Sequence, residues 1–264
     1  PFFISFIANI ARKRPELKRD KTILSEIVHD VVSEITPGMT TRQIDEAIRL
    51  RIVSNGLIPT MLGYRGFPAV SAISVSPALL HSPPSGQTVS NGDLLTIQTS
   101  ASSNFSHASL GFTFPVGCIS REGHNVVSGC RRALENAIKR VRAGVRTGEV
   151  SHEIQQSLEA FGLAPIRDFV GYSMGRERIQ APQILGYGPP TRGDVLEAGM
   201  ILNIHVIGSS GDFRTRVDPD LWTVRMRDEA LAAIATAMVL VQEDGYKVLT
   251  RLPEVSSVID DCSS

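Results

Sequence analysis

The chain has 264 residues, of which 42% are hydrophobic and 20% are charged. This length and composition allow one large core or two small domains and exclude a short disulfide-stapled scaffold. The 27 basic residues balance the 27 acidic ones, and the isoelectric point is about 7.4. Such neutrality argues against a broad surface for nucleic acid or an anionic membrane, so we expect neither partner and only local recognition.

The cysteines Cys118, Cys130 and Cys262 form neither a paired framework nor a CxxC motif. This pattern is typical of reduced thiols and predicts a cytoplasmic protein. The apolar run of residues 1–10 is about half as long as a bilayer-spanning helix, and basic residues follow it rather than precede it. We therefore interpret residues 1–16 as an N-terminal extension that packs on or caps the domain.

Apolar residues at helical spacing predict two helices in the first part of the chain. One covers residues 20–35, and the second begins with Thr41 as its N-cap. Residues 69–76 then alternate between apolar and small or polar side chains, as a half-buried strand does. The runs GDLLTIQTSASS and HASLGFTFPVG are separated by Asn104-Phe105, which predicts a hairpin.

Helices and strands follow one another again in the rest of the chain. Two helices are predicted at about residues 124–141 and 151–161. The last third holds the strand-like runs GMILNIHVIG, DLWTVRM and YKVLTRLPE. Its alanine-rich run LAAIATA is compatible with a helix by propensity. Mixed helices and strands of this kind predict an α+β fold.

The sequence repeats itself internally. Residues 37–64 are similar to residues 143–172, with matching glycine, threonine and Gly-Leu positions. Downstream of each copy, GDLLTIQ matches GMILNIH, which places Gln98 and His205 at equivalent positions. The repeat predicts two halves related by a pseudo-twofold axis, with a central cleft between them, because ligand sites favour such interfaces.

The repeat also sets the expected domain boundaries. We expect one domain over residues 17–250, built from halves of about residues 17–120 and 121–250. Residues 251–264 would form a C-terminal tail. The sequence makes no prediction of the oligomeric state.

Several motifs appear in an order that resembles the type I methionine aminopeptidases of the pita-bread M24 metallopeptidase superfamily. They are LGYRGFPAVSAISVS followed by His81, then GDLLTIQ, FSHASLGFTFPVG, GYSMGRERIQAPQ, GMILNIH, WTVRMRD and DGYKVLT. The resemblance covers nearly the whole chain. It implies the pita-bread fold, an α+β fold of two duplicated halves around a central cleft.

In the resembled family, two aspartates, a histidine and two glutamates bind two divalent metals that activate a shared water. The matching positions here are Gln98, Ser109, Tyr172, His205 and Thr236. None is a carboxylate, so nothing offsets the desolvation of two dications. A second acid/base histidine of the family is replaced by Ile179. We therefore predict that no metal or other cofactor is bound and that aminopeptidase activity is absent.

The resemblance also assigns other residues of the cleft. His81 matches a family histidine that contacts substrate, and His107 matches another cleft histidine. Arg178 replaces an aromatic residue of the specificity pocket. This cation is either a clamp for a substrate carboxylate or phosphate, or a structural residue that forms a salt bridge or points to solvent. The remaining wall of that pocket matches Tyr64, Phe67 and Trp222.

Two functional hypotheses follow. The first is a metal-independent enzyme of lyase, cyclase, isomerase or hydrolase type that acts on a small anionic molecule, as in small-molecule biosynthesis. Its acid/base groups would be His81, Tyr172 and His205, since imidazoles titrate near neutral pH. Creatinase-like members of the resembled superfamily likewise use a histidine without a metal. The groups expected to orient the substrate are Gln98, Ser109, Thr236 and Arg178.

The second hypothesis is a non-catalytic pseudo-peptidase whose cleft binds a peptide or a protein partner. In that case His205 would be a structural histidine facing Gln98 or Ser109. A single metal held by His81, His107 and His205 is a less favoured third option. An open pocket in which the three acid/base groups converge favours catalysis, whereas an exposed apolar patch or a cleft blocked by Arg178 favours binding.

Overall fold

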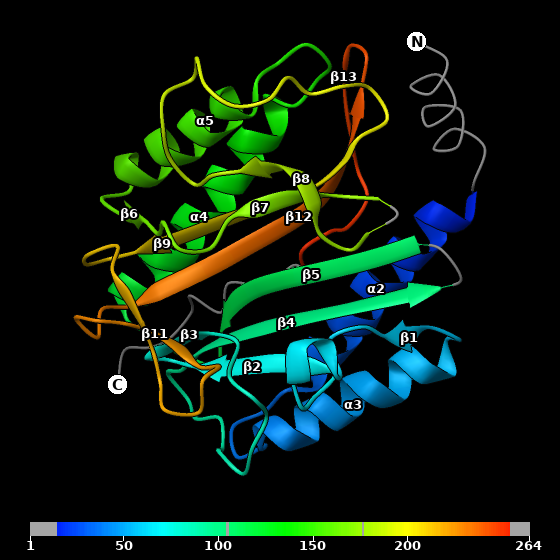
Figure 1. Ribbon diagram of the computed structural model, residues 1–264. Coiled ribbons are helices and arrows are strands. Elements are labelled where there is room, and N and C mark those ends of the chain that lie inside the picture. Colours follow the sequence, from blue (N-terminus) through cyan, green and yellow to red (C-terminus); the bar gives the residue numbers. More distant parts are fainter. Residues whose placement is uncertain (1–14, 104–105, 176, 254–264) are drawn as a thin grey trace.

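The structure is a computed structural model that describes residues 15–103, 106–175 and 177–253. The apolar run at the N-terminus and nearly all of the predicted C-terminal tail lie outside these residues. Two pairs of helices accompany a large twisted sheet (Figure 1), one pair beside the strands of each half of the chain. The expected α+β pita-bread architecture is confirmed.

The first half begins with a helical pair and continues with strands. Its elements are α2 (Pro15–Glu34), α3 (Thr41–Ser54), β1 (Ile58–Pro59), the short 3-10 helix η1 (Tyr64–Gly66), β2 (Ser71–Val75), β3 (Ala78–Leu80), β4 (Leu94–Ser103) and β5 (Ser106–Pro115). The predicted hairpin is confirmed, because β4 and β5 pair antiparallel along their whole length.

The N-cap of α3 is Thr40 and not Thr41, so the sequence-based prediction was wrong by one residue. The Thr40 hydroxyl accepts a hydrogen bond from the Gln43 N–H at 3.2 Å, and the Gln43 side chain accepts one from the Thr40 N–H at 2.8 Å. This reciprocal capping box satisfies two backbone donors at the start of the helix. Thr41 is buried instead, and its hydroxyl accepts a hydrogen bond from the Ser85 N–H at 2.8 Å.

The second half repeats the order of helices and strands. Its elements are α4 (Arg121–Lys139), α5 (Thr147–Ala160), β6 (Ala164–Pro165), β7 (Gly171–Met174), β8 (Gln180–Ile184), β9 (Ile201–Ser209), β10 (Thr215–Val217), β11 (Val224–Met226), β12 (Ala232–Gln242) and β13 (Gly245–Val248). Helix α4 begins before the predicted residue 124 because the Ser120 side chain caps it, accepting from the Gly123 N–H at 3.0 Å.

The alanine-rich run LAAIATA lies mostly in β12, so the helix suggested by its propensity does not form. Strand β12 pairs with β5 on one side and with β9 on the other. Ala233, Ala235 and Ala237 share one face of this strand and belong to the core beneath α4. These small side chains let the helix approach the sheet closely, and burial at the centre of the sheet overrides helix propensity.

The duplication is visible in matching backbone contacts. Strand β1 pairs with the end of β4, where Ile58 lies opposite Ser102, and β6 pairs with the end of β9, where Ala164 lies opposite Ser209. The halves join where β5 pairs with β12 in the strand order β1-β4-β5-β12-β9-β7-β8. The strands of both halves thus belong to one sheet, whereas the single domain and its boundaries at about residues 17, 120 and 250 stay a prediction.

Each half has its own hydrophobic core between its helices and its strands. Strand β4 points Leu95 and Ile97 into the first core, and β9 points Leu202 and Ile204 into the second. Because side chains alternate along a strand, Gln98, the next residue after Ile97, points to the opposite face. The helices thus cover one face of the sheet and leave polar side chains on the other.

The cysteines differ from the sequence-based expectation in one respect. Cys130 is a free, buried thiol, and burial raises its pKa to about 12. Cys118 is disulfide-bonded, so the expectation of reduced thiols is wrong for this residue. Cys262 lies outside the described residues. The prediction of a cytoplasmic location therefore loses part of its support and stays a prediction. Within the part of the chain described, no helix combines the length and the apolar character that membrane crossing requires.

Candidate active site

A cavity of about 740 Å³ lies on the face of the sheet opposite the helices. Its lining comes from both halves of the chain, as expected for a cleft between duplicated halves. The sequence-predicted site residues that line it are Tyr64, Phe67, His81, Gln98, Ser109, Tyr172, Arg178, His205, Trp222 and Thr236. These residues therefore meet at one cavity, and their roles stay predictions.

His107 does not line this cavity, in contrast to its predicted role in substrate binding. It lies on β5 opposite Ser102, close to the end of the hairpin, where Ser103 pairs with Ser106. His107 and Ser109 share a face of the strand, but two residues of strand separate them by about 7 Å. Only Ser109 reaches the cavity.

The side chains of Gln98 and Thr236 stand on either side of Gly111. A Cβ atom on Gly111 would lie 3.4 Å from the Gln98 Cγ and 3.4 Å from the Thr236 Cγ2. The Thr236 hydroxyl accepts a hydrogen bond from the Gly111 N–H at 2.8 Å. The Gln98 Oε1 accepts one from the His81 N–H at 3.1 Å. Each of these oxygens accepts a hydrogen bond from a backbone N–H.

The residues at the five positions that match the family's metal ligands do not fit a pair of divalent metals. Gln98, Ser109, Tyr172, His205 and Thr236 supply no carboxylate, and two of their oxygens already bind N–H groups. Among the described residues, no group of three or more histidine, cysteine, aspartate or glutamate side chains is placed to hold a metal ion. Hard divalent cations take oxygen ligands, carboxylates above all, in place of the water that they lose.

Tyr172 and His205 form the centre of the cavity wall. Their rings meet edge-on, with centroids 5.1 Å apart. Tyr172 lies opposite Asn203 in the pairing of β7 with β9, and its hydroxyl accepts a hydrogen bond from the Asn203 amide nitrogen at 3.2 Å. Asn203 is fully buried. Because the hydroxyl oxygen accepts this bond, its own hydrogen is left to donate to a molecule in the cavity.

Both cavity histidines have lowered pKa values. Burial lowers the pKa of His205 from 6.5 to about 4, and the nearby His81 adds to this effect because two imidazolium ions would repel each other. Burial also lowers the pKa of His81. The two imidazoles are therefore neutral at neutral pH, which is the form that accepts a proton.

His81 has an uncommon backbone conformation, with φ at 59°. A residue other than glycine in the left-handed region is strained and needs support from its surroundings. The hydrogen bond from its N–H to Gln98 supplies part of this support, and the ring meets Phe169 edge-on at 5.3 Å. The structure thus holds the His81 side chain at the cavity wall.

Arg178 lies over the ring of Tyr64, with the guanidinium carbon 3.7 Å from the ring centroid. Its Nη1 donates to the Thr60 carbonyl oxygen at 3.2 Å and to the Ser100 hydroxyl at 3.1 Å. No carboxylate among the described residues forms a salt bridge with it. Of the two structural roles considered from the sequence, neither a salt bridge nor a swing to solvent is seen.

Several lining residues were missed by the sequence analysis. Ser100 follows Gln98 by two positions on β4, so strand alternation was the signal that could have found it. Asp168 and Phe169 come from the segment before β7, and Gln183 comes from β8. No pattern in the sequence marked these last three, because their place depends on how the second half folds over the cavity.

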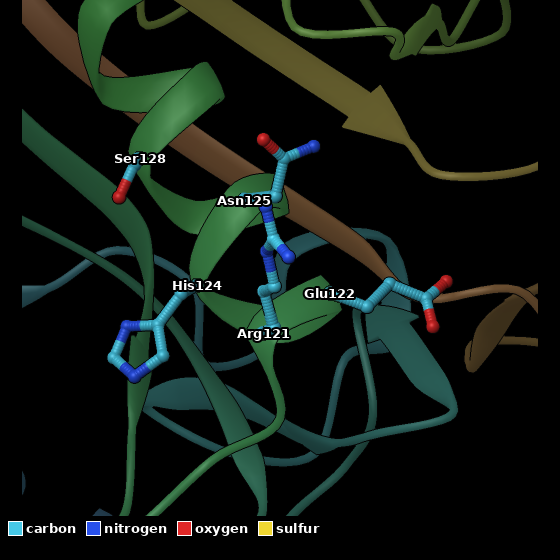
Figure 2. Close-up of a pocket in the computed structure, with 5 residues that line it drawn as sticks. All are labelled: Arg121, Glu122, His124, Asn125 and Ser128. Atoms are coloured by element: carbon cyan, nitrogen blue, oxygen red, sulfur yellow. The ribbon is translucent and has the colours of Figure 1, made fainter.

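A second hollow, also of about 740 Å³, lies along the first turns of α4. Figure 2 shows its lining side chains, Arg121, Glu122, His124, Asn125 and Ser128, which all project from this one helix. A ligand site needs polar groups that converge from several elements. Because this hollow has a single wall among the described residues, the cavity between the halves is the better candidate.

Comparisons with known proteins agree with this fold. Residues 16–239 match the sequence profile of metallopeptidase family M24. The chain is 32% identical over 236 residues to a methionine aminopeptidase of Clostridium perfringens, which covers 89% of this chain and 95% of that protein. It is 29% identical over 237 residues to methionine aminopeptidase 1 of Bacillus subtilis, covering 89% and 96%.

Solved structures give the same result. The crystal structure of methionine aminopeptidase from Rickettsia prowazekii superposes with a TM-score of 0.87 at 25% identity, covering 89% of this chain and 96% of that one. The Thermotoga maritima enzyme superposes with a TM-score of 0.84 at 31% identity, covering 90% and 98%. The match of sequence and fold over most of both chains shows that this protein belongs to metallopeptidase family M24.

Proposed function

We propose that this chain is an enzyme that acts on a small anionic molecule by acid/base catalysis, without a metal ion and without methionine aminopeptidase activity. The observation that carries the proposal is the convergence of His81, Tyr172 and His205 in one cavity. Two neutral imidazoles and a phenol hydroxyl are a sufficient set for moving a proton to and from a substrate.

The proposed chemistry assigns a separate role to each group. The neutral imidazole of His81 takes a proton from the substrate and becomes an imidazolium ion. His205, whose pKa burial lowers to about 4, is the weaker base for this step. The Tyr172 hydroxyl, whose oxygen is held by Asn203, donates a hydrogen bond to the substrate oxygen on which negative charge develops. Return of the proton to another atom of the substrate restores the imidazole. This sequence suits an isomerase or a lyase.

The absence of carboxylates at the matching ligand positions supports a mechanism without metals. The charged groups among the described lining residues are the guanidinium groups of Arg65 and Arg178 and the carboxylate of Asp168, so cationic groups outnumber anionic ones. A neutral or cationic wall raises the affinity for anions and lowers it for divalent cations. An anionic substrate therefore fits this cavity better than a metal-bound peptide does.

The test is to incubate the protein with a small-molecule extract of its source cells in the presence of a chelator and to follow the masses of anionic metabolites. We expect one metabolite to be converted with the chelator present. The His81→Ala variant should lower the rate by about two to four decades, which is typical for loss of an acid/base group. His29→Ala is the matched control, because His29 is exposed on α2, and its rate should equal that of the unchanged protein.

Three outcomes contradict the proposal. The first is turnover that stops on chelation and returns with manganese or cobalt. The second is release of methionine from a methionyl peptide. The third is calorimetric binding of two equivalents of either metal at the tight affinity expected of a dinuclear site.

One observation favours the alternative of a non-catalytic binding protein. Apolar side chains at the edge of the cavity are well exposed, with 81% of Leu221, 57% of Val217 and 42% of Ile179 open to solvent. Exposed apolar residues beside a cavity are a common feature of peptide-binding surfaces. If this alternative is correct, unstructured peptides bind without being changed, and His81→Ala leaves their affinity unaltered.

A further inference from the structure

Arg178 uses only one side of its guanidinium group. Nη1 donates to Thr60 and Ser100, whereas Nε is buried and has no hydrogen-bond partner among the described residues. Nη2 likewise donates to no described residue. Nε and Nη2 form one edge of the guanidinium plane, on which two parallel N–H bonds can meet the two oxygens of a carboxylate. The N–H groups of this edge donate to no acceptor among the described residues.

The guanidinium is also held in a fixed position. The Tyr64 ring covers one face at 3.7 Å, and the Thr60 hydroxyl donates to the Ser100 hydroxyl at 2.7 Å. The Ser100 oxygen thus accepts from both Thr60 and Arg178, and its own hydrogen is left to donate into the cavity that it lines. A cation fixed before binding loses little conformational entropy when an anion arrives.

The charges around the cavity leave this cation without a neutralising partner. Asp168 is the carboxylate among the described lining residues, and it accepts a hydrogen bond from the Thr215 hydroxyl at 2.5 Å. Arg65, the other cation of the lining, lies beside the same Tyr64 ring at 5.6 Å. A buried N–H without an acceptor is costly, and an anionic ligand relieves that cost.

The cavity that Arg178 lines also has an apolar, aromatic part of its wall. Phe67 and Trp222 meet edge-on with centroids 5.1 Å apart, and both line the cavity. Phe67 also belongs to a small buried cluster against which Trp222 and Met61 pack. Such a wall accommodates a flat or bulky apolar group of a ligand that enters the same cavity.

We propose that the Nε–Nη2 edge of Arg178 binds the carboxylate of the substrate, while an aromatic or other apolar group next to that carboxylate packs against Phe67 and Trp222. This inference rests on the proposed function and names its substrate class, an arylalkyl or aryl carboxylate. A carboxylate is chosen because one guanidinium edge offers two parallel donors, which match two oxygens. A phosphate dianion would call for further cations around it.

The experiment measures binding of benzoate, benzamide and phenyl phosphate to the whole chain by calorimetry. Benzoate and benzamide have nearly the same shape and differ in charge. We expect benzoate to bind at least about tenfold more tightly, since a charge-assisted bidentate pair is stronger than a neutral one. Arg178→Gln should abolish this preference, and Arg178→Lys should keep only part of it. Arg65→Gln, which removes a neighbouring cation, should leave the preference in place.

A second measurement uses the unchanged protein and so does not depend on whether a variant folds. In a nitrogen-15 NMR spectrum of the arginine Nε–H groups, benzoate should shift the resonance of Arg178 and benzamide should not. Equal affinity for benzoate and benzamide, an unshifted Nε–H resonance, or a preference that survives Arg178→Gln overturns the proposal. Phenyl phosphate that binds more tightly than benzoate overturns the choice of carboxylate.

These measurements separate the inference from the proposed function, because they follow binding and not turnover. A lost benzoate preference leaves the His81→Ala turnover test unaffected. Conversely, the protein could prefer benzoate and still convert no metabolite. That result would support the carboxylate site at Arg178 and contradict only the catalytic proposal.

Discussion

The partly buried imidazole of His205 makes the protein sensitive to acid. Burial lowers the pKa of His205 in the folded chain to about 4, against 6.5 for an unhindered histidine. Between these values the unfolded chain binds a proton that the folded chain does not. Stability is therefore lost as the pH falls from about 6.5 towards about 4, and it is regained as the pH rises.

The magnitude follows from the difference between the two pKa values. A shift from 6.5 to about 4 corresponds to about 3 kcal/mol at a pH below both pKa values, and to about 2.5 kcal/mol at about pH 4.5. The free energy of unfolding of a typical domain is only about 5–15 kcal/mol, so this loss is a large part of it. The effect should be easy to resolve.

Urea unfolding at about pH 7 and about pH 4.5 measures this loss of unfolding free energy. The signal is the fluorescence of Trp222, the one tryptophan of the chain. His205→Gln keeps a polar side chain that does not titrate, so its loss of stability between the two pH values should be smaller by about 2.5 kcal/mol. His29→Gln is the control, because 56% of the His29 side chain is exposed, and it should behave like the unchanged protein. Equal pH dependence of His205→Gln and the unchanged protein would refute the reasoning.

Two further predictions concern close contacts in the sheet. A Cβ atom on Gly171 would lie 2.7 Å from the Asn203 carbonyl oxygen, so Gly171→Ala should lower the unfolding free energy by about 1–3 kcal/mol. Gly86→Ala, where nothing lies within 4 Å, should change it little in the same urea titration. Thr236→Val removes the acceptor of the buried Gly111 N–H and should cost about 1–3 kcal/mol; an unchanged urea midpoint would contradict this role.

Local sequence patterns identified most of the fold because they are set by the chain's own geometry. The period of apolar residues in α2 and α3 records the face that each helix buries. The alternation over residues 69–76 correctly predicted a strand, β2, but every residue of this strand is buried, so the expectation of a half-buried strand was wrong. The run LAAIATA has no apolar pattern that distinguishes a helix from a strand. Whether it becomes a strand depends on the edges of β5 and β9, which lie far away in the sequence, and on the close approach of α4.

The candidate site, too, was predicted from the sequence only in part. The internal repeat aligned Gln98 with His205, and the matching of motifs added Ser109, Tyr172 and Thr236, all of which line the cavity. His107 was matched in the same way but does not line the cavity. A match in sequence does not tell how far along a strand the cavity extends.

The sequence by itself determined the duplicated α+β fold and the membership of an M24-like group, since these follow from residue types and their spacing. Only the tertiary structure decided which polar groups meet. It placed Tyr172 against Asn203, lowered the pKa of His205 by burial and left Arg178 without a carboxylate partner among the described residues. The physical reason is that burial, charge and hydrogen bonding depend on distances between residues that are remote in the chain.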